Sequence, residues 1–287
     1  MTHHIPRIRV RAQNGALLIR DGLRIHFHMP QPHSVLEPLI ERALGVYRQA
    51  VGASALGGYA NEEGEWVALD EDGWRAAHQE LHGEGFSNVV LRDAVPGESR
   101  YRFEYFGKDL GNLISSVGFW LPTEFQEEHG PARVRALALA LASDLPFSFG
   151  QVGPSLQCQL DVLGVRDEVD TYRFRHPGMD VSMLDQLSNT LGTRVRGPAW
   201  MNFLGPPVLS ELGGIEALRS RLHSPDTTVQ ALGQDRAVVT LGPHPEAGDT
   251  EQGQTLPAYR ELARVLEPWL YQSSTPEERR WQRRFLD

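Results

Sequence analysis

The chain has 287 residues and a formal net charge of −9, with 37 Asp and Glu residues against 28 Lys and Arg residues. A chain of this length can form one large domain or two small ones around a core that needs no covalent staple. The acidic balance argues against a protein that binds nucleic acid, because such proteins normally carry a basic surface.

Cysteine content and hydropathy indicate where the protein is expected to work. Cys158 is the sole cysteine, so no intrachain disulfide can form, which fits a reducing compartment. The opening sequence MTHHIPRIRV has no apolar signal-peptide core, and no apolar stretch approaches the ~18 residues of a membrane span. We therefore expect a cytoplasmic protein with neither a membrane nor a nucleic acid as its partner.

Residues 23–29 begin the regular pattern of the chain. Their strict alternation of apolar and polar side chains predicts a strand whose second face is polar and carries His26 and His28. Ser34 is the predicted N-cap of the helix that follows, over residues 35–52.

The rest of the chain alternates between patterns typical of strands and of helices. Strands are predicted over a short stretch before residue 70 and over 88–93, 101–107, 112–121, 199–205 and 236–242. Helices are predicted from the acidic turn at 70–72 to Gly83, and over 131–145, 181–192, 214–223 and 255–270. The C-terminal segment is expected to dock as a short helix through Trp281 and Phe285.

These patterns predict an α+β fold with a mixed, largely antiparallel sheet and helices packed on it. Two segments, FWLPTEFQEEHGPARVRAL and FLGPPVLSELGGIEALRSR, match at a constant offset of 84 residues. Both indicate a strand, a proline turn, a short helical turn, a glycine break and a longer helix. An internal duplication with halves 1–155 and 156–287 is one interpretation, and similar turns that arose independently are the other. No linker marks a boundary, so a single domain over 1–287 is expected.

Acidic residues gather between residues 61 and 74, where no Lys or Arg occurs. One interpretation is a solvated loop that aids solubility. The other is an acidic face with an aromatic anchor that meets a basic protein partner. We name this set the acidic segment and take its members as the candidate partner-binding residues: Glu62, Glu63, Glu65, Trp66, Asp70, Glu71 and Asp72.

Motifs for catalysis or metal binding are weak. The sequence HQELH places His78 and His82 on one helix face, but Gln79 stands where a zinc protease needs its glutamate base. His26, His28 and His33 offer an alternative metal site that would support a metal-dependent hydrolase. No G-x-S-x-G elbow or phosphate-binding glycine loop is present. We therefore expect no enzyme activity, no catalytic residues, no metal and no cofactor.

Several segments together resemble a known family. They are IHFHMP, GFWLPTEFQEEHGPARVRALALALASDLP, GPAWMNFLGPPVLSELGGIEAL and AGDTEQGQTLPAYRELARVLEP, which fall between about residues 23 and 268. This set is similar to the type VI secretion immunity family TsiV. The residues that carry the likeness are turn and packing residues, so they indicate a family more than a site.

The resemblance implies a protein that binds and silences a cognate type VI effector, which in this family is often a nuclease. A nuclease binds phosphates and therefore presents a basic cleft. The implied function is an immunity protein, involved in bacterial competition, that occludes the effector's active site. Two alternatives to the immunity protein stay open. One is the metal-dependent hydrolase described above, and the other is an adaptor that loads an effector without inhibiting it. The sequence leaves the effector's identity, the oligomeric state and the strand order open.

Overall fold

The computed structural model of the chain describes residues 5–93, 100–109, 113–181 and 183–287. Unit 1 comprises residues 1–23, 148–182 and 193–287, and unit 2 comprises residues 24–147 and 183–192. Strand β2 (Leu17–Met29) belongs to both units, because the boundary falls after Leu23. Residues 112 and 182, which fall within two predicted elements, lie outside the described residues.

Unit 2 is built on antiparallel strands that follow the last residues of β2. In sheet order they are β7 (Ser115–Pro122), β6 (Arg102–Lys108), β5 (Phe86–Asp93), β3 (Leu56–Ala60) and β4 (Trp66–Ala68). The register aligns Tyr105 of β6 with Val89 on one side and Val117 on the other. The helices of the unit are α1 (His33–Val51), α2 (Glu71–Leu81), α3 (Thr123–Ala142) and α5 (Leu184–Thr190).

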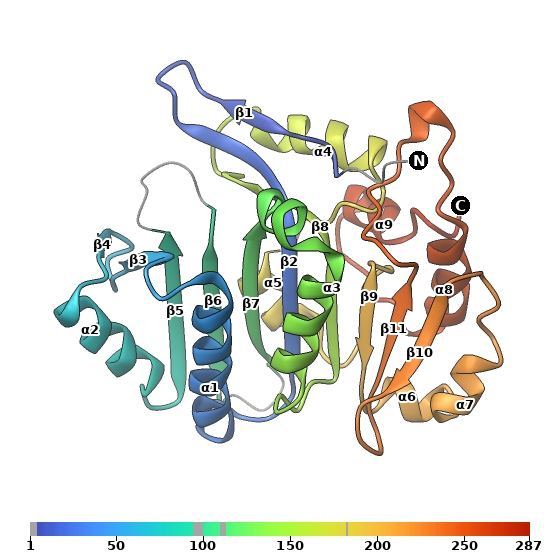
Figure 1. Cartoon of the computed structure of the whole chain (residues 1–287), viewed down its shortest axis with the longest axis horizontal. Coiled ribbons are helices and arrows are strands. Elements are labelled where there is room, and N and C mark those ends of the chain that lie inside the picture. The colour runs from blue at the N-terminus through green and yellow to red at the C-terminus, as the bar shows by residue number, and fades with distance from the viewer. Residues whose placement is uncertain (1–4, 94–99, 110–112, 182) are drawn as a thin grey trace. The chain divides into compact units, whose positions relative to one another are not determined.

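Helices cover both faces of this sheet. Helices α1 and α3 contact each other and lie on one face (Figure 1). On that face the buried rings of Tyr47 and Phe119 lie 5.3 Å apart, and those of Phe119 and Phe103 lie 5.6 Å apart. Helix α5 contacts β6 and β7 from the other face, where Leu184 approaches Gly118. The alternation of Gly118 and Phe119 along β7 separates the two faces.

The polar face predicted for the strand at 23–29 is buried inside the protein. His26 and His28 are 2% and 0% exposed, so both faces of this part of β2 are buried. The Nδ1 atom of His28 lies 2.7 Å from Ser116 Oγ on β7. Neighbouring strands are covered on the same face by α5, so polar side chains there need partners within the protein.

The predicted N-cap at Ser34 is wrong. Helix α1 begins at His33, and the N-cap position is Pro32, which has no side chain that can accept a hydrogen bond. The backbone N–H of Ser34 instead donates to Asp109 Oδ1 at 3.2 Å. A carboxylate that follows β6 therefore supplies the acceptor that a capping side chain would otherwise provide.

Unit 1 has its own antiparallel strands, in the order β10 (Thr227–Ala231), β11 (Ala237–Leu241), β9 (Met201–Leu204) and β8 (Phe149–Cys158). Strand β1 (Arg9–Arg11) pairs with the first part of β2. The α-helices of the unit are α4 (Val165–Arg175), α6 (Val208–Glu211), α7 (Gly214–Arg219), α8 (Pro257–Leu266) and α9 (Pro276–Gln282). Two 3-10 turns, η1 (Thr250–Gln252) and η2 (Glu267–Trp269), accompany them.

The predicted docking of the C-terminal segment is confirmed. Trp281 and Phe285 are 0% and 1% exposed. The α+β fold with antiparallel strands is confirmed as well. None of the described helices combines the length and the apolar character needed to cross a membrane.

The two matching segments share a strand, a following helical segment and a glycine with positive φ. Strand β7 runs into the first part of α3, which is interrupted at Gly130, whose φ is 76°. Strand β9 runs into the short helix α6 and then α7, where Gly214 has a φ of 82°. Both positions adopt the left-handed region that glycine tolerates at no steric cost. The duplication and its halves remain predictions, as does the single domain over 1–287.

Candidate partner-binding surface

The first part of the acidic segment is a tight hairpin between β3 and β4. The backbone N–H of Asn61 donates to Glu65 O at 2.9 Å, and the side chain of Asn61 accepts from Glu65 N at 2.7 Å. Gly64 closes the turn with a φ of 79°, which a residue with a Cβ adopts only with strain. The turn therefore holds the backbone of Glu62, Glu63 and Glu65 while all three side chains remain exposed.

The second part of the acidic segment is the start of α2. Leu69 is buried, and its N–H donates to Gly57 O at 2.9 Å, which anchors the chain between β4 and the helix. Asp70 is the N-cap, and its Oδ1 accepts from Gly73 N at 3.0 Å. Glu71 and Asp72 occupy the first turn, where negative charge interacts favourably with the helix dipole.

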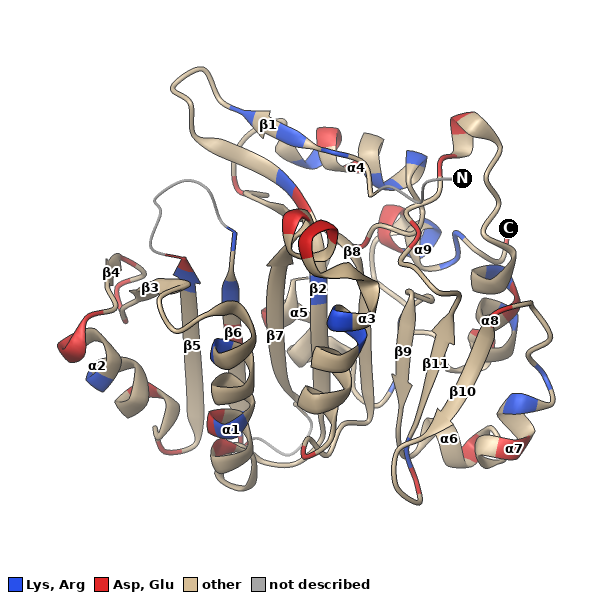
Figure 2. Cartoon of the chain, viewed as in Figure 1, with Lys and Arg blue, Asp and Glu red and all other residues tan. Residues whose placement is uncertain are grey.

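The structure brings all seven candidate residues into one exposed segment. Figure 2 shows the acidic colour at the start of α2 and around β3 and β4. Arg75 contacts Asp72 at 2.5 Å and Glu71 at 3.9 Å, so two carboxylates have a cationic neighbour on the same helix. Such exposed pairs are screened by water and contribute little to stability.

Trp66 is the aromatic member of the acidic segment. Its side chain is partly exposed, at 38%, and the guanidinium of Arg92 lies 3.9 Å from its ring centroid. Val67, next to it on β4, is also exposed. An exposed tryptophan held by a cation on one side is suited to contact a protein partner with its remaining surface.

An open groove of about 650 Å³ lies beside the acidic hairpin turn. Glu62 and Glu63 contribute to it from the turn, Glu80 from α2 and Phe86 from β5. Phe86 is 52% exposed, which is unusual for a phenylalanine, and Glu80 accepts from Asn88 N at 3.0 Å. The groove thus combines carboxylates with an exposed ring.

Sequence reasoning did not include Glu80 or Phe86 in the candidate surface. Phe86 follows a glycine pair at 83 and 85 that marks the turn into β5, and its place in the alternation of that strand is on the exposed side. Only this alternation could have indicated exposure. Nothing in the local sequence indicates that α2 and β5 meet the hairpin turn at one groove.

A separate charge cluster lies within unit 2. Glu104 on β6 contacts Arg102 at 2.8 Å and also pairs with Arg24 on β2. Burial by itself would raise the pKa of Glu104, but Arg102 and Arg24 outweigh it and hold the pKa below its usual value. Because the partners of Glu104 lie within unit 2, this cluster stabilises the fold and is separate from the acidic segment.

The structure does not assemble the alternative site at His26, His28 and His33. The rings of His26 and His28 lie 5.2 Å apart on β2. His33, at the start of α1, contacts Tyr105 Oη at 2.9 Å and Gly83 O at 3.0 Å through its two ring nitrogens. Within the described ranges, these three histidines do not form a group whose ligand atoms could surround one metal ion.

A different histidine pair does meet carboxylates. His78 and His82 on α2 face Glu41 and Glu37 on α1, and one ligand atom each from Glu41, His78 and His82 lie within 4.8 Å of one another. The i, i+4 spacing of the two histidines was visible in the sequence. The carboxylates come from a helix some forty residues earlier, so the sequence did not indicate them.

Comparison with known proteins gives a structural neighbour and a family. No curated protein has a significant match to the chain. The solved structure titled Pseudomonas aeruginosa T6SS protein PA0821 is similar with a TM-score of 0.80 and 19% identity, over 96% of this chain and 87% of that chain. At this identity the likeness supports the fold alone. The family model described as type VI immunity for VRR-NUC matches residues 39–285, so the chain belongs to the TsiV family of type VI immunity proteins.

Proposed function

We propose that this protein is a non-enzymatic inhibitor that binds a cognate type VI effector, a nuclease, and covers its active site with the acidic segment. The observation that carries the proposal is the exposed set of carboxylates on the β3–β4 turn and the start of α2, beside Trp66 and the groove. The description of the family names VRR-NUC as the target of the immunity.

The physical basis of the proposal is charge complementarity. A nuclease binds the phosphates of its substrate with a basic surface, so carboxylates can take the place of phosphates there. Opposite charges also accelerate association, up to about 10⁸–10⁹ M⁻¹s⁻¹ at low salt. Trp66, Val67 and Phe86 supply apolar area that charge alone does not, and such area slows dissociation.

The inhibitor must be present where the effector would cut nucleic acid. We therefore propose that the protein acts in the cytoplasm of the cell that produces it. Its working state is a stoichiometric complex with the effector, and no turnover is needed.

Charge reversal of the hairpin turn tests the role of the acidic segment. The triple variant Glu62→Lys, Glu63→Lys and Glu65→Lys leaves the buried anchor Leu69 unchanged. We expect association with the proposed partner, a VRR-NUC effector, to slow at least about tenfold at low salt, and the salt dependence of the rate to weaken. Stopped-flow or surface-plasmon measurements at two salt concentrations give both quantities.

A matched variant separates local charge from net charge. Asp161, Asp167 and Asp235 are exposed carboxylates in unit 1, and reversing all three changes the net charge by the same amount. We expect this variant to associate nearly as fast as the wild type. Equal slowing by both triples, or no slowing by either, would remove the acidic segment from the proposed interface.

Titration of the effector tests the non-enzymatic inhibition. Nuclease activity should fall linearly and reach zero at a fixed molar ratio of the two proteins. Inhibition by far less than one equivalent would contradict a stoichiometric inhibitor. Co-expression gives the cellular test, because an adaptor would leave the effector toxic whereas an inhibitor restores growth.

A further inference from the structure

The motif HQELH, from His78 to His82, lacks a residue that zinc-dependent catalysis requires. Gln79 replaces the glutamate base that a zinc protease requires, so hydrolysis at this motif is not expected. Metal binding depends instead on the ligand atoms that surround the two histidines. In the fold, those atoms come from α1.

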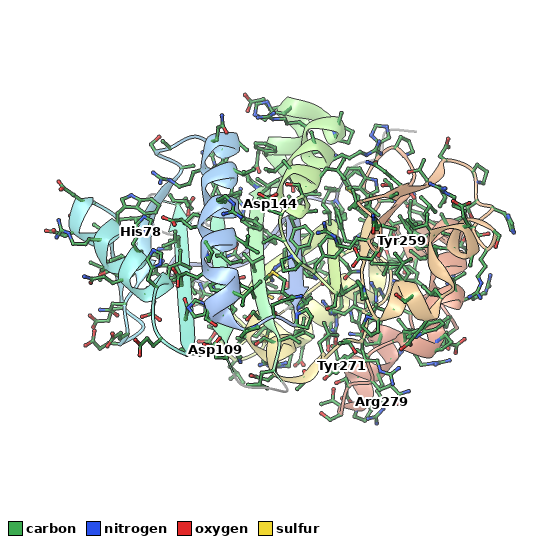
Figure 3. The ribbon with its side chains drawn as sticks, turned by 90° about the horizontal axis from the view of Figure 1, so that it is seen from below. His78, Asp109, Asp144, Tyr259, Tyr271 and Arg279 are labelled. Carbon is green, nitrogen blue, oxygen red and sulfur yellow. The ribbon has the colours of Figure 1, made fainter. Side chains whose placement is uncertain are left out.

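Two pairs of side chains face each other between α1 and α2. Glu37 and Glu41 are one helical turn apart on α1, and His78 and His82 are one turn apart on α2. The imidazole rings are nearly parallel, with an interplanar angle of 15° and centroids 6.2 Å apart. Both rings therefore point the same way from the helix, toward the carboxylates (His78 is labelled in Figure 3).

The distances are close to those of a bound zinc ion. Four ligands at about 2.1 Å in a tetrahedron lie about 3.4 Å from one another. His78 Nδ1 and Glu41 Oε1 are already 3.6 Å apart. The three ligand atoms of Glu41, His78 and His82 lie within 4.8 Å of one another. Bringing them to zinc-binding distance needs only rotation of side chains that are partly exposed.

Glu37 holds the orientation of His82. It pairs with His82 Nδ1, so the ring presents Nε2 as the atom that remains for a metal. A carboxylate bonded to the outer nitrogen of a ligating histidine is the usual arrangement around zinc, where it sets the tautomer and the ring direction.

We propose that Glu41, His78 and His82 bind one Zn²⁺ ion, with Glu37 as the positioning residue for His82. Two imidazoles and a carboxylate are a ligand set that zinc favours, and exposure leaves the fourth position to water. The ion would link α2 to α1. Since Asp70 caps α2 and Glu71 and Asp72 begin it, zinc would stabilise the helix end that holds three of the seven residues of the acidic segment.

Zinc titration of the full chain without a polyhistidine tag tests the site. We expect one zinc per chain by calorimetry and by elemental analysis after dialysis. At a free zinc concentration a hundredfold above Kd, the midpoint of thermal unfolding should rise by about 5 °C. Absence of stoichiometric binding would overturn the proposal.

Four variants locate the ion. His78→Asn and His82→Asn should abolish stoichiometric binding and the thermal shift, and Glu37→Gln should weaken affinity by about 10–100-fold. His129→Asn is the matched control, because this exposed histidine lies on α3, outside the cluster.

The N-terminal residues His3 and His4 are a second possible source of metal binding, and their joint replacement by Asn controls for it. Zinc that remains bound in His82→Asn, or that is lost when His3 and His4 are replaced, would contradict the site between α1 and α2. Because His78 and His82 are surface side chains, circular dichroism of the metal-free variants should match the wild type.

Discussion

Gly73 and Gly45 are both helical glycines, and we predict that replacing them by alanine has opposite effects on stability. Gly73 lies at the start of α2, directly after the acidic segment, and Gly45 lies in the exposed part of α1. In a helix interior, exchange of glycine for alanine gains about 0.8–1.0 kcal/mol when nothing obstructs the new methyl group.

The surroundings of the two positions differ sharply. A Cβ added at Gly45 meets nothing within 4 Å, so Gly45→Ala should stabilise the protein by about 1 kcal/mol. A Cβ added at Gly73 would lie 2.2 Å from Ala68 O and 3.2 Å from Tyr59 Cε1. Ala68 O is a backbone atom that cannot rotate away, so overpacking of about 3 kcal/mol outweighs the helix gain and leaves Gly73→Ala about 2 kcal/mol less stable.

Urea unfolding of the two variants measures the difference. The expected gap of about 3 kcal/mol separates their midpoints by about 1 M if the unfolding slope is about 3 kcal/mol/M. Gly73→Ala should also alter the binding of the effector, since the new methyl group pushes α2 away from β4. A Gly73→Ala variant as stable as Gly45→Ala would refute the close approach of α2 to β4.

Two further predictions concern buried polar groups of unit 2. Glu104→Gln should destabilise the protein by about 3 kcal/mol at neutral pH, because Arg24 and Arg102 lose their carboxylate. The lowered pKa of Glu104 means that its contribution is present above the usual carboxyl pKa and is lost as pH falls through the lower folded value. Acid unfolding of the wild type and Glu104→Gln should therefore converge at low pH, and a constant difference would contradict this reasoning. Tyr47→Phe should lower the free energy of unfolding by about 1–2 kcal/mol, because Tyr47 Oη donates to Trp120 O at 2.5 Å in the core. Urea unfolding measures this change, and an unchanged midpoint would show that water replaces the hydroxyl.

Local sequence pattern was sufficient for most elements of the fold. The alternation along residues 101–107 predicted β6. The glycine at 130 and the proline at 131 predicted the start of a helix, and the structure has a kink in α3 at this place. Both patterns depend on neighbouring residues alone. The N-cap predicted at Ser34 was wrong, because Asp109, a residue distant in sequence, accepts the hydrogen bond from the Ser34 N–H. The burial of the polar face of β2 was not predicted, because it depends on partners such as Ser116 on another strand.

The acidic segment was also predictable in part. Its charge, its tryptophan and its turn residues are read directly from the sequence. The exposure of its carboxylates follows as well, because a run of carboxylates without basic residues has to remain in water. The groove beside it and the cluster of Glu37, Glu41, His78 and His82 were decided by tertiary structure. Each joins segments that are separated by tens of residues, and which faces of α1, α2 and β5 meet depends on long-range packing that no local period encodes.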